Sequence, residues 1–481
     1  MNRKLVFNVL GRMLTALAAL LLMPLAVSVL YREWSAGIAF AATAGISLAL
    51  GAGMRLLTRR HSSVLYAKEG FIIVALVWLA ASSVGALPFY FSGEIPTYVD
   101  ALFETVSGFT TTGASILTDV EALSRGMLFW RSFTHWIGGM GVLVFIIAFL
   151  SNISDRSIHI LRAEMPGPIV GKLVPRSKDT SKVLYIMYIA LTLTQIVLMA
   201  LGGMPLYDSV VHAFGTAGTG GFGIRADSIS SYSPYLQWVI TVFMLLFGVN
   251  FNVYYFILIK RGREAVKSTE LWVYGGIVLA AGLLIASNIR TMYGGVEETL
   301  RQAFFQVSSV ITTTGFATTD FNLWPSFSKA ILVLLMFVGA CAGSTGGGLK
   351  ISRLVILLKL ITREIRRMVH PRAVTTVKYE GKPLDDHTQN SVATYFAVYM
   401  ILILLIFLVL SLEPFDLETN FTAAVSCFNN IGPGLSVVGP MGSYAGYSPF
   451  AKLVLTAAML LGRLEIFPLL IAVIPSTWRK R

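Results

Sequence analysis

The sequence predicts an all-α polytopic membrane protein of about ten transmembrane helices, in which two extra helices precede four repeats of helix, pore loop and helix around one pseudo-fourfold pore. Three observations predict this fold. Of the 481 residues, 55% are hydrophobic and 13% are charged, which is a membrane composition. The apolar residues form runs long enough to cross a bilayer. Between the later runs, four similar segments end in glycine, which indicates an internal repeat.

The predicted spans follow from the apolar runs. A run of about 20 residues crosses the hydrocarbon core, and such runs begin near positions 8, 34, 70, 127, 182, 235, 270, 327, 392 and 449. The first run follows a basic N-terminus, but it is long for a signal peptide and lacks a small-residue cleavage site, so we expect a retained helix. Glycines interrupt several of these spans, notably Ser326–Lys359, and we expect such spans to be broken or tilted.

The positive charges are distributed unevenly between the two sides of this arrangement. The net charge is +13, and 29 of the 38 Lys and Arg residues fall in segments on one side of the ten spans. The positive-inside rule then places both termini in the cytoplasm. Because topology explains the basic face, no nucleic acid partner is needed.

Motifs of enzymes and metal sites are missing from the sequence. The two cysteines, Cys341 and Cys427, lie in apolar or pore-loop segments without metal-ligand spacing, so we expect neither a disulfide nor a zinc site. Walker loops, zinc-protease motifs and nucleophile elbows do not occur, which argues against an enzyme. We expect no soluble domain of useful size, and therefore no organic cofactor in this chain.

The internal repeat is visible in four segments: 103–113 (FETVSGFTTTG), 211–221 (VHAFGTAGTGG), 305–315 (FQVSSVITTTG) and 422–432 (TAAVSCFNNIG). Their final glycines are 108, 94 and 117 residues apart, which leaves room for two spanning helices per unit. Each unit is predicted to run helix, short pore helix, glycine turn, helix. The predicted units are a two-helix preface at 1–69 and pore repeats at 70–160, 180–265, 270–365 and 390–481.

Four glycine turns in one chain can surround a single axis with inward-pointing carbonyls. Carbonyl oxygens that replace a hydration shell are how K⁺ filters work, and glycine permits the positive dihedral angles that such loops need. We therefore expect cation ligands, from carbonyl or hydroxyl oxygens, at Thr111, Thr112, Gly113, Thr219, Gly220, Gly221, Thr313, Thr314, Gly315, Asn430, Ile431 and Gly432. The fourth loop lacks the threonines of the others.

Acidic residues near the loop starts are better explained as helix caps than as ion-recruiting groups; they are Asp100, Asp208, Glu297, Glu298, Asp416 and Glu418.

With these filters in place, the sequence resembles the Trk/Ktr/HKT superfamily of K⁺ transporters, and within it the bacterial TrkH/TrkG membrane subunits. The resemblance covers nearly the whole chain. It includes Trp130–Gly141 after the first filter, the Gly339–Lys350 run, and His370-Pro371 in a basic loop. The two-helix preface fits the Trk branch better than the shorter Ktr branch. The resemblance implies K⁺ uptake across a bacterial inner membrane by a homodimer, each subunit with its own pore, regulated by a cytosolic nucleotide-binding (TrkA-like) ring.

Glycine at all four filter positions goes with K⁺ selectivity in this superfamily, whereas serine at the first goes with Na⁺. Gly113, Gly221, Gly315 and Gly432 are all present, so the resemblance implies K⁺ as the transported ion. A Na⁺-permeable or Na⁺-coupled transporter of the same superfamily is the alternative. The sequence leaves both a passive channel and H⁺- or Na⁺-coupled uptake open.

Two features are gate candidates. The run Gly343, Ser344, Thr345, Gly346, Gly347 and Gly348 cannot continue a stable helix, because each glycine costs about 1 kcal/mol relative to alanine; the family's intramembrane gating loop falls here, and close helix packing is the alternative.

Arg463 lies in the last apolar run, where a charge is expensive. Glu465 is on nearly the opposite helix face, so we expect another partner for Arg463. The resemblance implies that Arg463 faces the pore beneath the filter. The alternative is that Arg463 forms a structural salt bridge between helices.

The basic loop between Lys350 and Lys382 is expected to face the cytosol. It contains Arg363, Arg366, Arg367, His370 and Arg372. Anionic lipid headgroups of the bilayer could account for it, but its position directly after the broken helix favours docking of a regulatory partner.

Overall fold

The computed structural model describes residues 2–59, 67–141, 177–372 and 375–478. Helices dominate these ranges, and six of them are long and apolar enough to cross a membrane. A bent helix pair would make a seventh span. The all-α membrane fold is therefore confirmed. The count of ten spans stays a prediction, because part of the fourth predicted span lies outside the described residues.

The N-terminal preface packs as a pair of antiparallel spans. It consists of α1 (Arg3–Leu20), α2 (Leu22–Leu30) and α3 (Trp34–Leu57). Gly11 and Gly51 let α1 and α3 approach backbone to backbone, because a Cβ on either would lie 2.7 Å from the carbonyl oxygen of the other. Small residues at such a crossing are typical of membrane helix packing.

The same order of elements then recurs four times, with a long helix, a short helix ending in a glycine loop, and a second helix. The first unit has α4 (Ala67–Gly85), α5 (Leu87–Ser92), α6 (Tyr98–Phe109) and α7 (Arg125–Gly139). The second has α10 (Ser177–Leu201), α11 (Leu206–Ala217), α12 (Pro234–Phe247), α13 (Phe251–Leu258) and α14 (Gly262–Val266). The third has α15 (Thr269–Ile289), α16 (Val296–Ile311), η2 (Phe321–Leu323), α17 (Ser326–Met336) and α18 (Ile351–Val369). The fourth has α19 (Asp386–Leu410), α20 (Leu417–Asn429), η3 (Ser436–Val438), α21 (Pro449–Arg463), α22 (Phe467–Val473) and η4 (Pro475–Trp478).

The second helices of three units are interrupted. The break that the sequence predicts in the third unit separates α17 from α18 over residues 337–350. Two further breaks lie at positions that the sequence did not single out. Helices α12 and α13 meet at an angle of 89°, and α21 gives way to α22 through Glu465 and Ile466, whose φ angles of 52° and 68° are left-handed.

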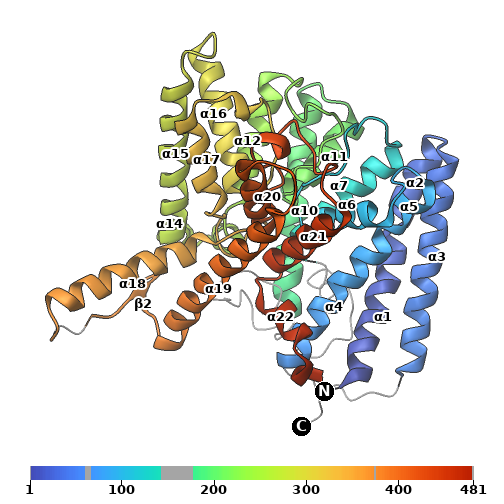
Figure 1. Ribbon diagram of the computed structural model, residues 1–481, viewed down its shortest axis with the longest axis horizontal. Coiled ribbons are helices and arrows are strands. Elements are labelled where there is room, and N and C mark those ends of the chain that lie inside the picture. The colour runs from blue at the N-terminus through green and yellow to red at the C-terminus, as the bar shows by residue number, and fades with distance from the viewer. Residues whose placement is uncertain (1, 60–66, 142–176, 373–374, 479–481) are drawn as a thin grey trace.

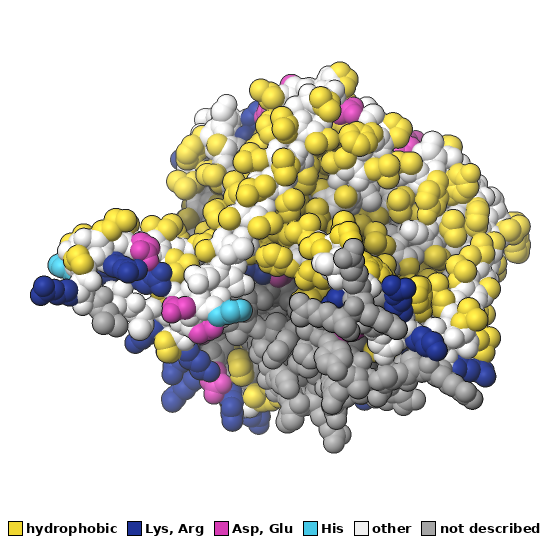
Figure 2. All heavy atoms as spheres, turned by 60° about the horizontal axis from the view of Figure 1, so that its bottom comes forward, with side chains coloured by type: hydrophobic (Ala, Val, Ile, Leu, Met, Phe, Trp, Pro, Cys, Tyr) yellow, Lys and Arg dark blue, Asp and Glu magenta, His cyan; other side chains and the backbone are white. Residues whose placement is uncertain are grey.

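One end of the molecule is basic, and the flanks are apolar. Helix α18 projects from the body of the molecule, together with the hairpin of β1 (Lys378–Tyr379) and β2 (Lys382–Pro383) (Figure 1). Figure 2 shows Lys and Arg side chains on and below this projection and at the lower right, with mostly hydrophobic side chains above them. The first and last described segments lie side by side at the bottom of the view in Figure 1, where Arg3 donates a hydrogen bond of 3.3 Å to the carbonyl of Trp478.

Candidate ion pathway

The four short helices end in loops that share one hydrogen-bonding pattern. The carbonyl six residues before each final glycine accepts a hydrogen bond from the amide just before that glycine. These bonds join Ser107 to Thr112 (2.8 Å), Gly215 to Gly220 (2.8 Å), Ser309 to Thr314 (2.8 Å) and Ser426 to Ile431 (3.0 Å). The register deduced from the sequence is thus reproduced in the backbone.

Each loop also repeats the same two left-handed residues. The residue two before the final glycine has a positive φ in every loop: 57° at Thr111, 54° at Thr219, 58° at Thr313 and 57° at Asn430. The final glycines have φ angles of 80°, 73°, 82° and 99°. L-residues rarely adopt such angles, so the four loops share a backbone shape that a chance turn would not give.

The glycines pack the four loops against one another in a closed ring. A Cβ built on Gly113 would lie 2.0 Å from the carbonyl oxygen of Gly220, and one on Gly221 would lie 2.0 Å from that of Thr314. A Cβ on Gly315 would lie 2.1 Å from the carbonyl oxygen of Ile431, and one on Gly432 would lie 2.7 Å from that of Thr112, which closes the ring. Any side chain at these positions would collide with the neighbouring loop. The four loops therefore surround one axis in chain order.

The carbonyl oxygens in this ring are free. Among the described residues, no donor reaches the carbonyl oxygens of Thr112, Gly220, Thr314 or Ile431. The Thr112 and Thr314 hydroxyls are occupied instead, each 2.7 Å from the hydroxyl of Thr110 or Thr312 at the end of the preceding helix. Of the two kinds of ligand that the sequence leaves open at these threonines, the carbonyl is the available one.

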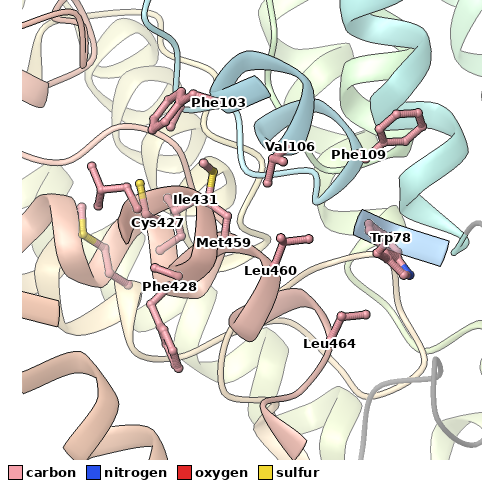
Figure 3. Packing of buried hydrophobic residues seen from close by; sticks show 14 of the residues in the cluster. Trp78, Phe103, Val106, Phe109, Cys427, Phe428, Ile431, Met459, Leu460 and Leu464 are labelled. Carbon is pink, nitrogen blue, oxygen red and sulfur yellow. The ribbon is translucent and has the colours of Figure 1, made fainter. Parts of the chain in front are cut away.

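The fourth loop replaces threonines with groups that tie it to its neighbours. Asn430 donates to the Thr112 hydroxyl and to the Met459 carbonyl, both at 2.9 Å. The Ile431 side chain is fully buried beside Cys427 and Met459 (Figure 3), so only its carbonyl can face the axis. Within the described part of the chain, Thr111 Oγ1 and Asn430 Oδ1 are buried without hydrogen-bond partners.

The ring opens into a cavity of about 310 Å³ on the side away from the basic end. All four final glycines line this cavity, together with the loops that follow them. Arg131 and Tyr444 contribute to its wall.

On the other side of the ring lies the loop of residues 337–350. Its Gly347 amide donates to the Thr313 hydroxyl at 2.7 Å, which places it directly against the third filter loop. Three backbone hydrogen bonds join it to the break between α12 and α13: Cys341 to Gly248 (3.1 Å), Thr345 to Phe247 (3.4 Å) and Phe251 to Gly343 (3.1 Å). The freed backbone groups of two broken helices thus satisfy each other, as membrane burial requires.

Arg463 lies beside this loop. Its guanidinium donates to the carbonyls of Thr345 (2.8 Å), Gly138 (2.5 Å) and Gly139 (2.9 Å). Glu465 instead receives two hydrogen bonds from Arg353, in line with the expectation that Arg463 needs another partner. Gly346, Gly347, Gly348, Lys350, Gly462, Arg463 and Glu465 line a small cavity of about 20 Å³. The structure therefore brings the glycine run and Arg463 together beneath the ring.

Comparisons with known proteins match this architecture. The family model described as TrkH, cation transport protein, matches residues 36–272 and 289–480. The chain belongs to the TrkH family of cation transport proteins. Members of this TrkH family are ion transporters rather than enzymes.

Curated relatives and a solved structure cover the full length of this TrkH-family chain. It is 36% identical to the Trk system potassium uptake protein TrkH of Salmonella typhimurium, over 100% of both chains. It is 35% identical to TrkG of Escherichia coli K12, over 95% of both chains. The crystal structure of the potassium transporter TrkH from Vibrio parahaemolyticus superposes with a TM-score of 0.89 at 33% identity and covers 100% of both chains.

Sequence reasoning missed three buried residues that brace the first two filter loops of this TrkH-family protein. Arg131 and Glu104 form an ion pair of 2.5 Å with side chains 3% and 0% exposed, and Arg131 also donates to the Gly223 carbonyl at 3.1 Å. His135 Nδ1 lies 2.7 Å from the Gly108 carbonyl, and its Nε2 accepts from the Phe222 amide at 3.3 Å. The one sequence signal for these supporting residues was the charge of Arg131 within the apolar segment Trp130–Gly141.

The capping interpretation holds for one of the six acidic residues at the starts of the short helices, since the N-caps of α6, α11 and α16 are Thr97, Pro205 and Gly295. Asp416 is the N-cap of α20 and accepts from the Thr419 amide at 2.7 Å. A hydrogen bond from the Thr419 side chain lowers the pKa of Asp416. Asp100, Asp208, Glu297, Glu298 and Glu418 lie in first helical turns, where negative charge is favourable.

Proposed function

We propose that this protein carries K⁺ into the bacterial cell through the ring of four filter loops. The observation that carries the proposal is the closed ring in which four glycines pack against four free carbonyl oxygens. Free carbonyls in the membrane interior need a partner, and a dehydrated cation is one. The curated relatives are named potassium uptake proteins, which supports K⁺ as the cargo.

The proposed ligands are the backbone carbonyls of the filter segments 111–113, 219–221, 313–315 and 430–432. The four short helices direct their C-terminal ends, which carry partial negative charge, toward the ring. Thr111 Oγ1 and Asn430 Oδ1, buried and without partners among the described residues, are additional oxygen donors at the inner edge. Because the cation is the cargo, no organic cofactor is required.

The proposed gate is the loop Gly343–Gly348 together with Arg463. The small cavity beneath the ring is too narrow for a hydrated ion, and the Arg463 guanidinium on its wall repels cations. The hydrogen bonds from Arg463 to Thr345, Gly138 and Gly139 hold the loop across the pathway. Conduction then requires the loop to move away from the ring.

The alternative function is Na⁺-permeable or Na⁺-coupled transport. The glycine at each of the four filter positions supports K⁺ over Na⁺ selectivity, and it leaves coupling to H⁺ or Na⁺ open.

The proposed setting is the bacterial inner membrane, with both termini and the basic end in the cytoplasm. The charge distribution supports this orientation. The family resemblance supports a homodimer, and the "Trk system" in the relatives' names supports partner subunits, for which a cytosolic nucleotide-binding (TrkA-like) ring is the candidate. The projecting, basic α18 region is the proposed docking surface.

Ion flux into proteoliposomes that contain the purified protein alone tests the function. We expect Rb⁺, the K⁺ surrogate, to enter faster than Na⁺ when membrane potential and pH gradient are set independently. Rb⁺ flux that follows the potential alone would indicate a channel-like pore, whereas flux only with a gradient would indicate coupling. Na⁺ flux exceeding Rb⁺ flux would overturn the proposal.

A further inference from the structure

Glu270 holds both ends of the proposed gate loop. It lies in the first turn of α15 and its side chain is 2% exposed. One carboxylate oxygen, Oε1, accepts hydrogen bonds from the Ala342 amide at 2.7 Å and the Ser352 amide at 3.0 Å. Ala342 precedes the Gly343–Gly348 run, and Ser352 follows it. A single carboxylate therefore closes the loop at its base.

The bond to Ser352 also caps helix α18. The N-cap residue of α18, Lys350, offers no side-chain cap, so the cap comes from α15 instead. A buried carboxylate is costly unless its hydrogen bonds are satisfied, and charge-assisted bonds to backbone amides are stronger than neutral ones. Any movement that separates the loop from α15 must break these bonds.

The cytosolic hairpin reaches the same point from outside. Glu380, in the hairpin turn, accepts from the Ser268 hydroxyl at 3.2 Å and from the Glu270 amide at 3.5 Å. On the other side of the hairpin, Lys359 of α18 donates to the Lys378 carbonyl at 2.8 Å. The hairpin thus touches α18, which follows the loop, and the start of α15, where Glu270 lies.

We propose that Glu270 is a positioning residue that couples the cytosolic hairpin Lys378–Pro383 to both ends of the gate loop. The inference rests on the proposed function, because it assumes that this loop gates the pore. A partner that displaces the hairpin pulls on the start of α15, and the Glu270 carboxylate transmits that pull to Ala342 and Ser352. In this proposal the regulatory partner contacts the hairpin, and Glu270 connects the hairpin to the gate loop.

Single-channel recording in planar bilayers tests this role with three variants. In Glu270→Ala, both loop anchors are lost, and the fraction of time open should rise at least about tenfold, because bonds to charged groups are the strongest of their kind. In Glu270→Gln, an acceptor oxygen remains, and the open fraction should stay within about threefold of wild type. Glu264→Ala, on the exposed α14, is the control and should change nothing.

Glu380→Ala tests the hairpin at an exposed residue. It should raise the open fraction, and it should add little when Glu270→Ala is already present, because residues that act through one another are not additive. K⁺ over Na⁺ selectivity should be unchanged in all variants. Fully additive effects of Glu380→Ala and Glu270→Ala would overturn the coupling.

The outcomes separate this inference from the proposed function. If the wild type conducts K⁺ selectively but Glu270→Ala has a wild-type open fraction and only a lower unfolding temperature, Glu270 is a structural cap and the inference fails. If the wild type conducts no K⁺ or Rb⁺, the proposed function fails instead.

Discussion

At the residue scale, the proposed filter depends on the absence of a Cβ atom at its glycines. Gly113 needs both a left-handed φ of 80° and the space that a Cβ would take 2.0 Å from the Gly220 carbonyl. Gly220 itself is required for another reason, because its Cβ would lie 2.2 Å from His135 Nδ1. The residues behind the ring are therefore as constrained as those that form it.

The ion pair of Glu104 with Arg131 gives a stability prediction. Glu104→Gln leaves the buried Arg131 guanidinium without its counter-charge, which costs about 3 to 5 kcal/mol. We expect a clear fall in the unfolding temperature of the purified protein in detergent. Glu264→Gln removes the partner of an exposed pair with Arg261, and it should cost less than about 1 kcal/mol. Equal effects of the two variants would contradict a structural role for the buried pair.

Arg463 gives a prediction about leak. Unit charges about 4 Å apart interact by about 4 kcal/mol near a protein surface, so loss of the guanidinium from the wall of the closed pathway should raise resting Rb⁺ flux at least about tenfold. Arg463→Lys keeps the charge and should leak little. The assay is Rb⁺ uptake into proteoliposomes without regulatory partners. Unchanged flux and gating in Arg463→Ala would favour a purely structural arginine.

The sequence predicted the register of the four glycine loops better than the residues that support these loops. The glycine register was readable because four copies could be compared. The hydroxyl bonds of Thr112 and Thr314 to the preceding helix ends were not readable, because nothing in a Thr-Thr-Gly segment tells which oxygen is free. Glu104, His135 and Glu270 were missed because their partners lie on other elements.

At the element scale, broken helices form the region beneath the ring of glycine loops, which is the lower half of the proposed pathway. Of the breaks, the sequence located the one in the third unit, because four glycines between Gly343 and Gly348 cannot continue a helix. The break at Gly248–Asn250 contains one glycine, and that at Glu465–Ile466 contains none. Tertiary contacts stabilise such breaks. At the break between α12 and α13, Cys341 and Thr345 form hydrogen bonds to the end of α12.

Gly347 links the gate loop to the filter and gives an element-scale prediction. In Gly347→Ala, the new Cβ would lie 2.7 Å from the Asn429 carbonyl oxygen and 3.0 Å from the Asn430 Cβ. The loop must shift away from the ring, and we expect resting Rb⁺ flux to rise several-fold. Gly275→Ala in α15 meets nothing within 4 Å and serves as the matched control. A wild-type transport rate in Gly347→Ala would remove the loop from the gate.

At the scale of the whole molecule, sequence and structure agree on a membrane protein with four related units and one basic end. The agreement has a physical basis, since hydrophobic run length and loop charge are governed by the bilayer rather than by tertiary detail. The number of spans is harder to predict, because a broken span reads as one apolar run but folds as two short helices.

Orientation gives a prediction at this scale. In a variant with Cys341→Ala and Cys427→Ala, a cysteine placed at exposed Lys382 in the hairpin should react with a membrane-impermeant maleimide only after cells are permeabilised. A cysteine placed at Asp119, in the loop after the first filter, should react in intact cells. The reverse pattern would contradict the cytoplasmic placement of the basic end.

We propose that the four glycine-packed carbonyl loops select K⁺. The most direct test is the K⁺ to Na⁺ permeability ratio of Gly113→Ser against wild type, measured from reversal potentials in planar bilayers. We expect a wild-type ratio well above one and a marked fall in the variant, because the serine Cβ cannot coexist with the Gly220 carbonyl in its present place. An unchanged ratio in a folded, conducting variant would contradict this proposal.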